Sequence, residues 1–132
     1  MSQTTAPPIP AKDSASASTT RAAIVLASLT ATHPELPGLH WSVTPYLSLG
    51  GNAPANDINT RVGQVAAWSR ALDVPVLVAV PHAGDLGTAS VSTTLSGVRV
   101  DVWAVVYRDE DETPVELSAR IRSLVIAAGG EV

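Results

Sequence analysis

The chain lacks cysteine and phenylalanine, and only one of its eight basic residues is a lysine. The absence of cysteine excludes a disulfide framework, cysteine-ligated zinc and a thiol nucleophile. No apolar run approaches the ~18 residues that a membrane span requires, so the sequence predicts no membrane protein. A chain of 132 residues fits one domain, which buries enough surface to fold without a metal or disulfide.

Basic charge is also scarce, because the chain has 12 acidic and 8 basic residues and a net charge of −4. Nucleic-acid binding needs clustered Lys and Arg, so this balance disfavours it. A DNA-associated regulator remains an alternative, and it requires four arginines to gather on one face. These are Arg99, Arg108, Arg120 and Arg122.

The first 18 residues are mostly Pro, Ser, Ala and Thr. Such a segment has little to bury, so residues 1–18 are predicted to be a disordered tail before a single domain at 19–132. Lys12 and Arg21 precede the apolar stretch Ala22 to Leu29, which loosely resembles a secretory signal over residues 12–32. An amphipathic helix that is capped by Thr19 or Thr20 and runs to about Thr32 is the preferred interpretation. It makes a cytoplasmic location the default and secretion the alternative.

Hydrophobic periodicity and turn residues predict the strands and the helix between residues 39 and 80. Residues 39–43 alternate as a half-buried strand, and extended structure resumes at 46–49 after Pro45. Gly50 to Asn52 then leads into a loop, and Asp57 caps a helix over 58–72. The nearly all-apolar segment 74–80 is typical of a strand buried on both faces.

Ser96-Gly97 predicts the turn of a β-hairpin that covers residues 89–107. The turn sets a register in which Leu95 faces Val98, and the same face then carries alternate apolar residues that meet the core. The last helix begins with Thr113 as cap, Pro114 in the first turn and Glu116 completing a capping box.

The predicted order is α-β-α-β-β-β-α. It indicates an α+β fold of two layers, with a roughly four-stranded, mostly antiparallel sheet and three helices on one face. The β-α-β start allows a parallel strand pair.

Catalytic motifs are missing. There is no G-x-S-x-G elbow and no S-x-x-K pair, and the histidines, His33, His40 and His82, lack the spacing of metal ligands. We therefore expect no enzyme activity, no catalytic or metal-binding residue and no cofactor. An alternative is a small-molecule-binding protein or enzyme that uses the loop containing His82 and Asp85, with His40 as a further member.

Two polar segments have structural interpretations. The acidic run Asp109 to Glu112 lacks the glycine and spacing of a calcium loop and precedes a helix start, where negative charge is favourable. Gly50 to Asp57 lies between a strand and a helix, where phosphate can bind, but it matches no phosphate-binding motif.

Trp103 is predicted on the polar face of the hairpin, in phase with four other residues. Together they form a candidate interaction surface: Arg99, Asp101, Trp103, Val105 and Tyr107. The alternative is that the N-terminal helix or tail covers this face. The leading hypothesis is a small acidic, non-enzymatic protein-interaction module with an accessory, regulatory or inhibitory role. Its partner is an unknown protein, and a homodimer through the hairpin edge or this face is a further candidate.

Three segments carry a resemblance: His40-Trp41-Ser42-Val43-Thr44, Ala67 to Leu72, and Val100-Asp101-Val102-Trp103. In these the chain resembles uncharacterised short hypothetical proteins of high-G+C actinobacteria and their phages or mobile elements. The resemblance covers residues 22–107 and consists of packing motifs. It implies no activity and no site residue.

Overall fold

The structure, a computed structural model, describes residues 10–44, 48–81 and 84–132. These residues form three helices and one five-stranded sheet. The elements in chain order are α1 (Pro10–Thr32), β1 (His40–Thr44), β2 (Ser48–Asn52), α2 (Ile58–Leu72), β3 (Leu77–Ala79), β4 (Leu86–Leu95), β5 (Val98–Tyr107) and α3 (Pro114–Ala127).

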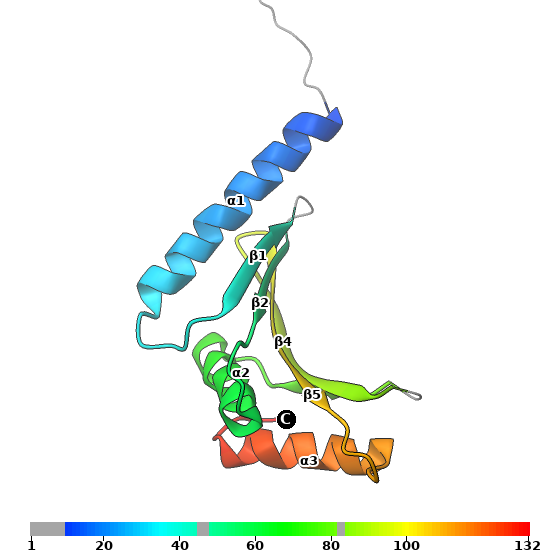
Figure 1. The fold of residues 1–132 in the computed structure, drawn as a ribbon. Coiled ribbons are helices and arrows are strands. Elements are labelled where there is room, and N and C mark those ends of the chain that lie inside the picture. The colour runs from blue at the N-terminus through cyan, green and yellow to red at the C-terminus, as the bar shows by residue number, and fades with distance from the viewer. Residues whose placement is uncertain (1–9, 45–47, 82–83) are drawn as a thin grey trace, which may run out of the picture.

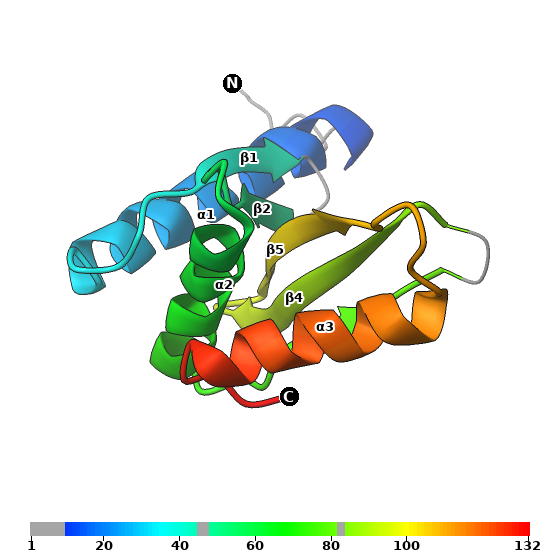
Figure 2. The ribbon, with the colours of Figure 1, turned by 60° about the horizontal axis from the view of Figure 1, so that its bottom comes forward.

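The sheet has the order β1-β2-β5-β4-β3, and β2–β5 is its one parallel pair among the described strands. The helices pack against one face: α1 along β1, β2 and β5, α2 on β4 and β5, and α3 on β3 and β4 (Figures 1 and 2). This arrangement confirms the two-layer α+β class, with five strands rather than four.

The additional strand is β2, which contains the segment Gly50 to Asn52 that was expected to be a loop. Glycine weakens a strand because it brings no side chain to pack. The local sequence pattern therefore does not predict the strand β2. Neighbouring side chains take the place of the missing ones. A Cβ at Gly50 would lie 2.9 Å from Cζ3 of Trp103, and one at Gly51 would lie 2.8 Å from Cδ1 of Leu39.

The expectation for residues 74–80 was wrong. The strand there, β3, has only three residues, forms the edge of the sheet beside β4, and exposes 66% of Leu77. A short edge strand gives little surface for pairing with other chains. The β-α-β start also allowed a parallel pair between the strand segments 39–49 and 74–80, and the structure does not form it. The strand β3 lies at the opposite edge of the sheet from β1, and the parallel pair is β2 with β5.

The hairpin prediction is confirmed. Leu95 pairs with Val98, Thr93 with Val100 and Val91 with Val102. Ser96 and Gly97 both have positive φ, of 51° and 78°, as a tight hairpin turn with the right twist requires.

Both predicted helix caps are present. An oxygen of the Asp57 carboxylate accepts a hydrogen bond from the Thr60 amide at 2.9 Å. Thr113 and Glu116 form the reciprocal capping box, with Pro114 in the first turn. These caps satisfy amide groups that a helix start otherwise leaves without partners.

The first helix begins at Pro10, well before the expected cap at Thr19 or Thr20, so part of the expected tail is helical. Residues 1–9 lie outside the described residues. The helix buries Ala22, Val25 and Leu29 against the sheet. Figure 1 shows its first turns extending beyond the end of the sheet.

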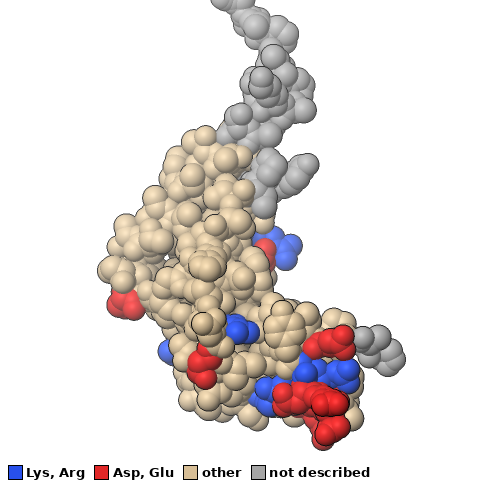
Figure 3. All heavy atoms as spheres, in the orientation of Figure 1, with Lys and Arg blue, Asp and Glu red and all other residues tan. Residues whose placement is uncertain are grey.

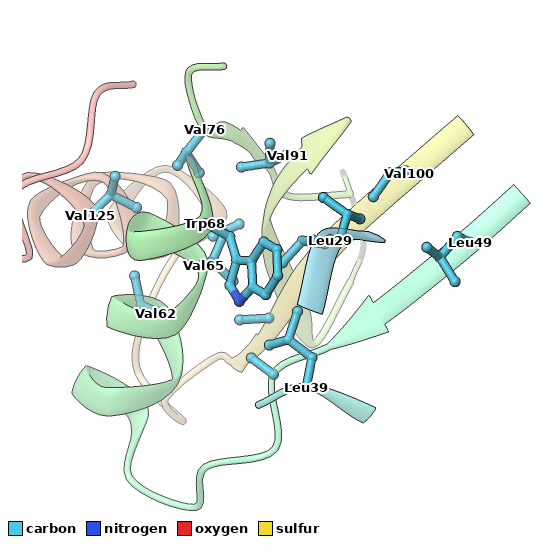
Figure 4. Close-up of a cluster of buried hydrophobic side chains, with 14 of the residues drawn as sticks. Leu29, Leu39, Leu49, Val62, Val65, Trp68, Val76, Val91, Val100 and Val125 are labelled. Carbon is cyan, nitrogen blue, oxygen red and sulfur yellow. The ribbon is translucent and has the colours of Figure 1, made fainter. Parts of the chain in front are cut away.

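Trp68 of α2 lies in the core, 2% exposed, among apolar side chains of helices and strands (Figure 4). Its ring meets Trp41 edge to face at 5.5 Å between centroids. Its indole Nε1 donates a hydrogen bond to the Pro37 carbonyl at 3.0 Å. This bond fixes the segment that joins α1 to β1, because a buried indole N–H needs an acceptor.

Candidate functional site

One face of the sheet is not covered by any described helix. We call it the open face. It consists of the alternate strand residues that point away from the helix layer, and the strand registers place all five residues of the predicted interaction surface on it. The first helix packs on the opposite face. The alternative in which that helix covers Trp103 is therefore wrong, and the part of the expected tail at residues 1–9 lies outside the described structure.

Trp103 is the largest side chain of the open face. It is paired with Ser90 of β4 and Asn52 of β2, and its ring leans over Gly50. The residue is half-buried because it rests on its own sheet and has solvent on its outer side. Tyr107 lies four residues further along β5, on the same face, and is 63% exposed.

Arg99 and Asp101 form a compensated pair near the hairpin turn. The Arg99 Nε lies 3.1 Å from the Asp101 carboxylate, and the Ser92 hydroxyl donates to the same carboxylate at 2.5 Å. The two charges cancel locally, and most of the other open-face side chains on β4 and β5 are hydroxylic, aromatic or aliphatic. This face therefore offers apolar contact and neutral hydrogen bonding rather than a field of one sign.

A notch interrupts the sheet where β2 ends. The strand β2 leaves the sheet after Asn52, whereas its partner β5 continues to Tyr107. The Ala53 amide donates the last backbone hydrogen bond to this edge of β5, to the Trp103 carbonyl at 2.9 Å. The next carbonyl on the same edge, that of Val105, accepts from Nη1 of Arg61 at 2.6 Å. The notch is an open hollow of about 310 Å³ whose walls include His40 and Tyr107.

The alternative acid–base site is not assembled among the described residues. His82 lies outside them. Asp85 has an 89% exposed side chain and pairs with Nη2 of Arg108 at 3.0 Å. His40 is on β1, with β2 and β5 between it and β4, and Asp85 does not line the hollow beside His40.

The acidic run 109–112 acts as a structural turn. Nε and Nη2 of Arg120 each donate to the Glu112 carboxylate at 2.8 Å. These bonds, together with one from the Asp109 amide, lower the pKa of Glu112 to about 2, and the same pair raises the pKa of Arg120. No group of three potential metal ligands occurs among the described residues.

The four arginines of the DNA alternative do not form one basic surface. Arg99 lies on the open face beside Asp101, whereas Arg108 and Arg120 are paired with acidic residues near the start of α3. Arg122 lies on α3 beside a separate groove. Figure 3 shows acidic and basic side chains intermixed where β5 meets α3. This intermixing gives no support to a phosphate-tracking surface.

Sequence reasoning missed three participants in this region: Gly50, Asn52 and Arg61. The first two were assigned to a loop, and Arg61 was an ordinary helix residue. Only the parallel pairing of β2 with β5 brings these positions to Trp103 and Val105. No local pattern in the sequence predicts that pairing.

Comparison of the chain with protein-family models, curated proteins and solved structures gives no match. Among the described residues, no helix combines the length and the apolar character needed to cross a membrane.

Proposed function

We propose that the chain is a small, acidic, non-enzymatic protein-interaction module that binds a partner protein through its open face. The observation that carries this proposal is Trp103, a half-buried tryptophan on a sheet face that no described helix covers. Tryptophan and tyrosine, together with arginine, are enriched among the residues that carry most of the binding energy at interfaces, and the two aromatic residues do so by burying large areas.

The chemistry of the face also defines the partner. Because Arg99 and Asp101 neutralise one another, the partner's surface is expected to be neutral and to offer an apolar side chain to Trp103. Hydroxyl groups from β4 lie on one side of that contact and would bind polar groups at its rim. A partner of strong single-sign charge would gain little here.

Site-specific photocrosslinking in cells of the source organism tests the proposal. A photoreactive phenylalanine analogue replaces Tyr107 on the open face or Ile126 on α3. Both side chains are 63% exposed in the free chain, so Ile126 is a matched control. We expect a crosslinked partner from position 107 and none from 126.

Two variants then locate the contact. Trp103→Asp and Tyr107→Asp are each expected to weaken binding of the crosslinked partner at least tenfold, while the dispersed amide spectrum of the fold is retained. Sedimentation velocity decides whether that partner is a second copy of the chain. Crosslinking from Ile126 alone, or normal binding by both folded variants, would overturn the proposal.

A further inference from the structure

The notch beside the end of β2 has the composition of an anion site. Four polar side chains line it: His40, Asn52, Arg61 and Tyr107. None of its described lining residues is acidic, although acidic residues outnumber basic ones in the chain as a whole. Polar groups that converge on a concave site with apolar walls are typical of a small-molecule site.

Arg61 is the charged group of this hollow, and its position is fixed by backbone carbonyls. Nε donates to Ala55 at 2.7 Å, Nη1 to Val105 at 2.6 Å and Nη2 to Asn56 at 3.1 Å. A guanidinium has five N–H groups, so two remain for a ligand. Since the carbonyls hold the group in place before any ligand arrives, binding loses little side-chain entropy.

Within the described part of the chain, no carboxylate pairs directly with Arg61. It takes part in none of the ion pairs among the described residues. The neighbouring carboxylate, Asp57, is not part of the hollow's lining. It is held at the start of α2 by the amide and hydroxyl of Thr60, both at 2.9 Å. Hydrogen bonds from Thr60 are also the main cause of its lowered pKa, to which Arg61 makes a smaller contribution.

The other polar side chains come from two strands and can complete a donor set. His40 and Asn52 are paired across β1 and β2, and Tyr107 is at the end of β5. Imidazole, amide and phenol groups each carry a hydrogen-bond donor. The rest of the wall is apolar, with Ala53, Pro54 and Val105 among its residues.

We propose that this hollow binds a small organic carboxylate, with the carboxylate on Arg61 and an apolar body of about one ring against Val105 and Pro54. The volume of about 310 Å³ is at the lower end of ligand sites, which run from about 300 to 1,000 Å³. The Arg61 fork fits a carboxylate or a phosphate, and the apolar wall favours the carboxylate. The hollow shares Val105 and Tyr107 with the predicted interaction surface, but benzoate binding to the isolated chain does not require the proposed protein partner.

The test is a nuclear magnetic resonance titration of the full ¹⁵N-labelled chain with benzoate, benzamide and inorganic phosphate. Benzoate and benzamide have nearly the same shape and differ in charge. We expect benzoate to give saturable amide shifts centred on residues 52–55, with an affinity at least tenfold above that of benzamide. Equal binding of the two, shifts that never saturate, or binding of phosphate but not benzoate would overturn the assignment.

Variants confirm the location. His40→Ala and Tyr107→Phe change exposed side chains at the rim of the hollow, so the fold should persist, and each is expected to weaken benzoate binding at least threefold. Arg61→Lys keeps the charge and removes the fork, and a tenfold loss is expected. Arg99→Ala, an arginine on the same face outside the hollow, is the control with unchanged affinity. Unchanged affinity in all three hollow variants would exclude this site.

Discussion

The indole of Trp103 lies over Gly50 so closely that a Cβ added at Gly50 would be 2.9 Å from Cζ3 and 3.0 Å from Cη2. The hydroxyl of Ser42 would be 3.3 Å from the same Cβ. Position 50 therefore has no room for a side chain, because the ring from the neighbouring strand occupies that space. The glycine and the tryptophan act as one packing unit on the open face.

Gly50→Ala is expected to displace the Trp103 ring and to lower the free energy of unfolding by about 1–3 kcal/mol, the usual cost of an overpacked position. Urea denaturation followed by tryptophan fluorescence measures the loss. In a Trp103→Ala background the ring is gone, so the same substitution should cost little or even stabilise the strand. An equal loss in both backgrounds would show that the ring is not the cause.

Gly63→Ala is the matched control for this prediction. Gly63 is in the helix α2, and the atom nearest to an added Cβ is the Cβ of Ala128, at 3.9 Å. Alanine favours a helix over glycine by about 0.5–1 kcal/mol, so this variant is expected to be more stable than the natural chain.

Trp68→Phe is expected to destabilise the fold by about 1–3 kcal/mol. The phenyl ring fills most of the space but leaves the partly buried Pro37 carbonyl without the indole N–H, from which it accepts a hydrogen bond at 3.0 Å. Guanidinium denaturation monitored by circular dichroism provides the value. Trp103→Phe is the control, since no hydrogen bond among the described residues involves the Trp103 side chain, and a loss as large as that of Trp68→Phe would refute the explanation.

Glu112→Gln is expected to change how stability depends on pH. Folding lowers the pKa of Glu112 from 4.5 to about 2, so the ionised group stabilises the fold above pH 4.5, and this contribution is lost as the pH falls toward 2. The natural chain should be more stable than the variant at pH 7, and the difference should shrink between pH 4.5 and 2.

Denaturation curves at several pH values test this, with Glu110→Gln as control. Glu110 belongs to the same acidic run but takes part in none of the ion pairs among the described residues. The stability of Glu110→Gln should therefore depend on pH in the same way as that of the natural chain. A Glu112→Gln difference that is constant across the whole pH range would contradict the linkage.

Local patterns in the sequence were sufficient for several elements. The turn at Ser96-Gly97 and the alternation around it determined the hairpin register, and the caps at Asp57 and Thr113 determined two helix starts. In each case the deciding interactions are within a few residues of one another in the chain. The open face followed from the same alternation, which is why Trp103 could be placed before the structure was known.

Long-range contacts account for what the sequence did not predict. Gly50 and Gly51 form a strand because tryptophan and leucine side chains from other elements cover them, and glycine by itself argues against a strand. The apolar composition of residues 74–80 predicts a buried strand. The strand in this segment, β3, is instead at the sheet edge, where Leu77 is exposed. The hollow at Arg61 arises because β2 is shorter than β5, a difference that only their pairing reveals.

The parallel pairing of β2 with β5 has a consequence for the order in which the molecule can form. The strand that the ribosome makes last, β5, is the central one, with β2 on one side and β4 on the other. Until residues 98–107 have emerged, the β1–β2 hairpin and the β3–β4 pair have no strand in common, and their edges stay open to wrong partners. A chain that stops before Val98 therefore contains four of the five strands and cannot form the sheet.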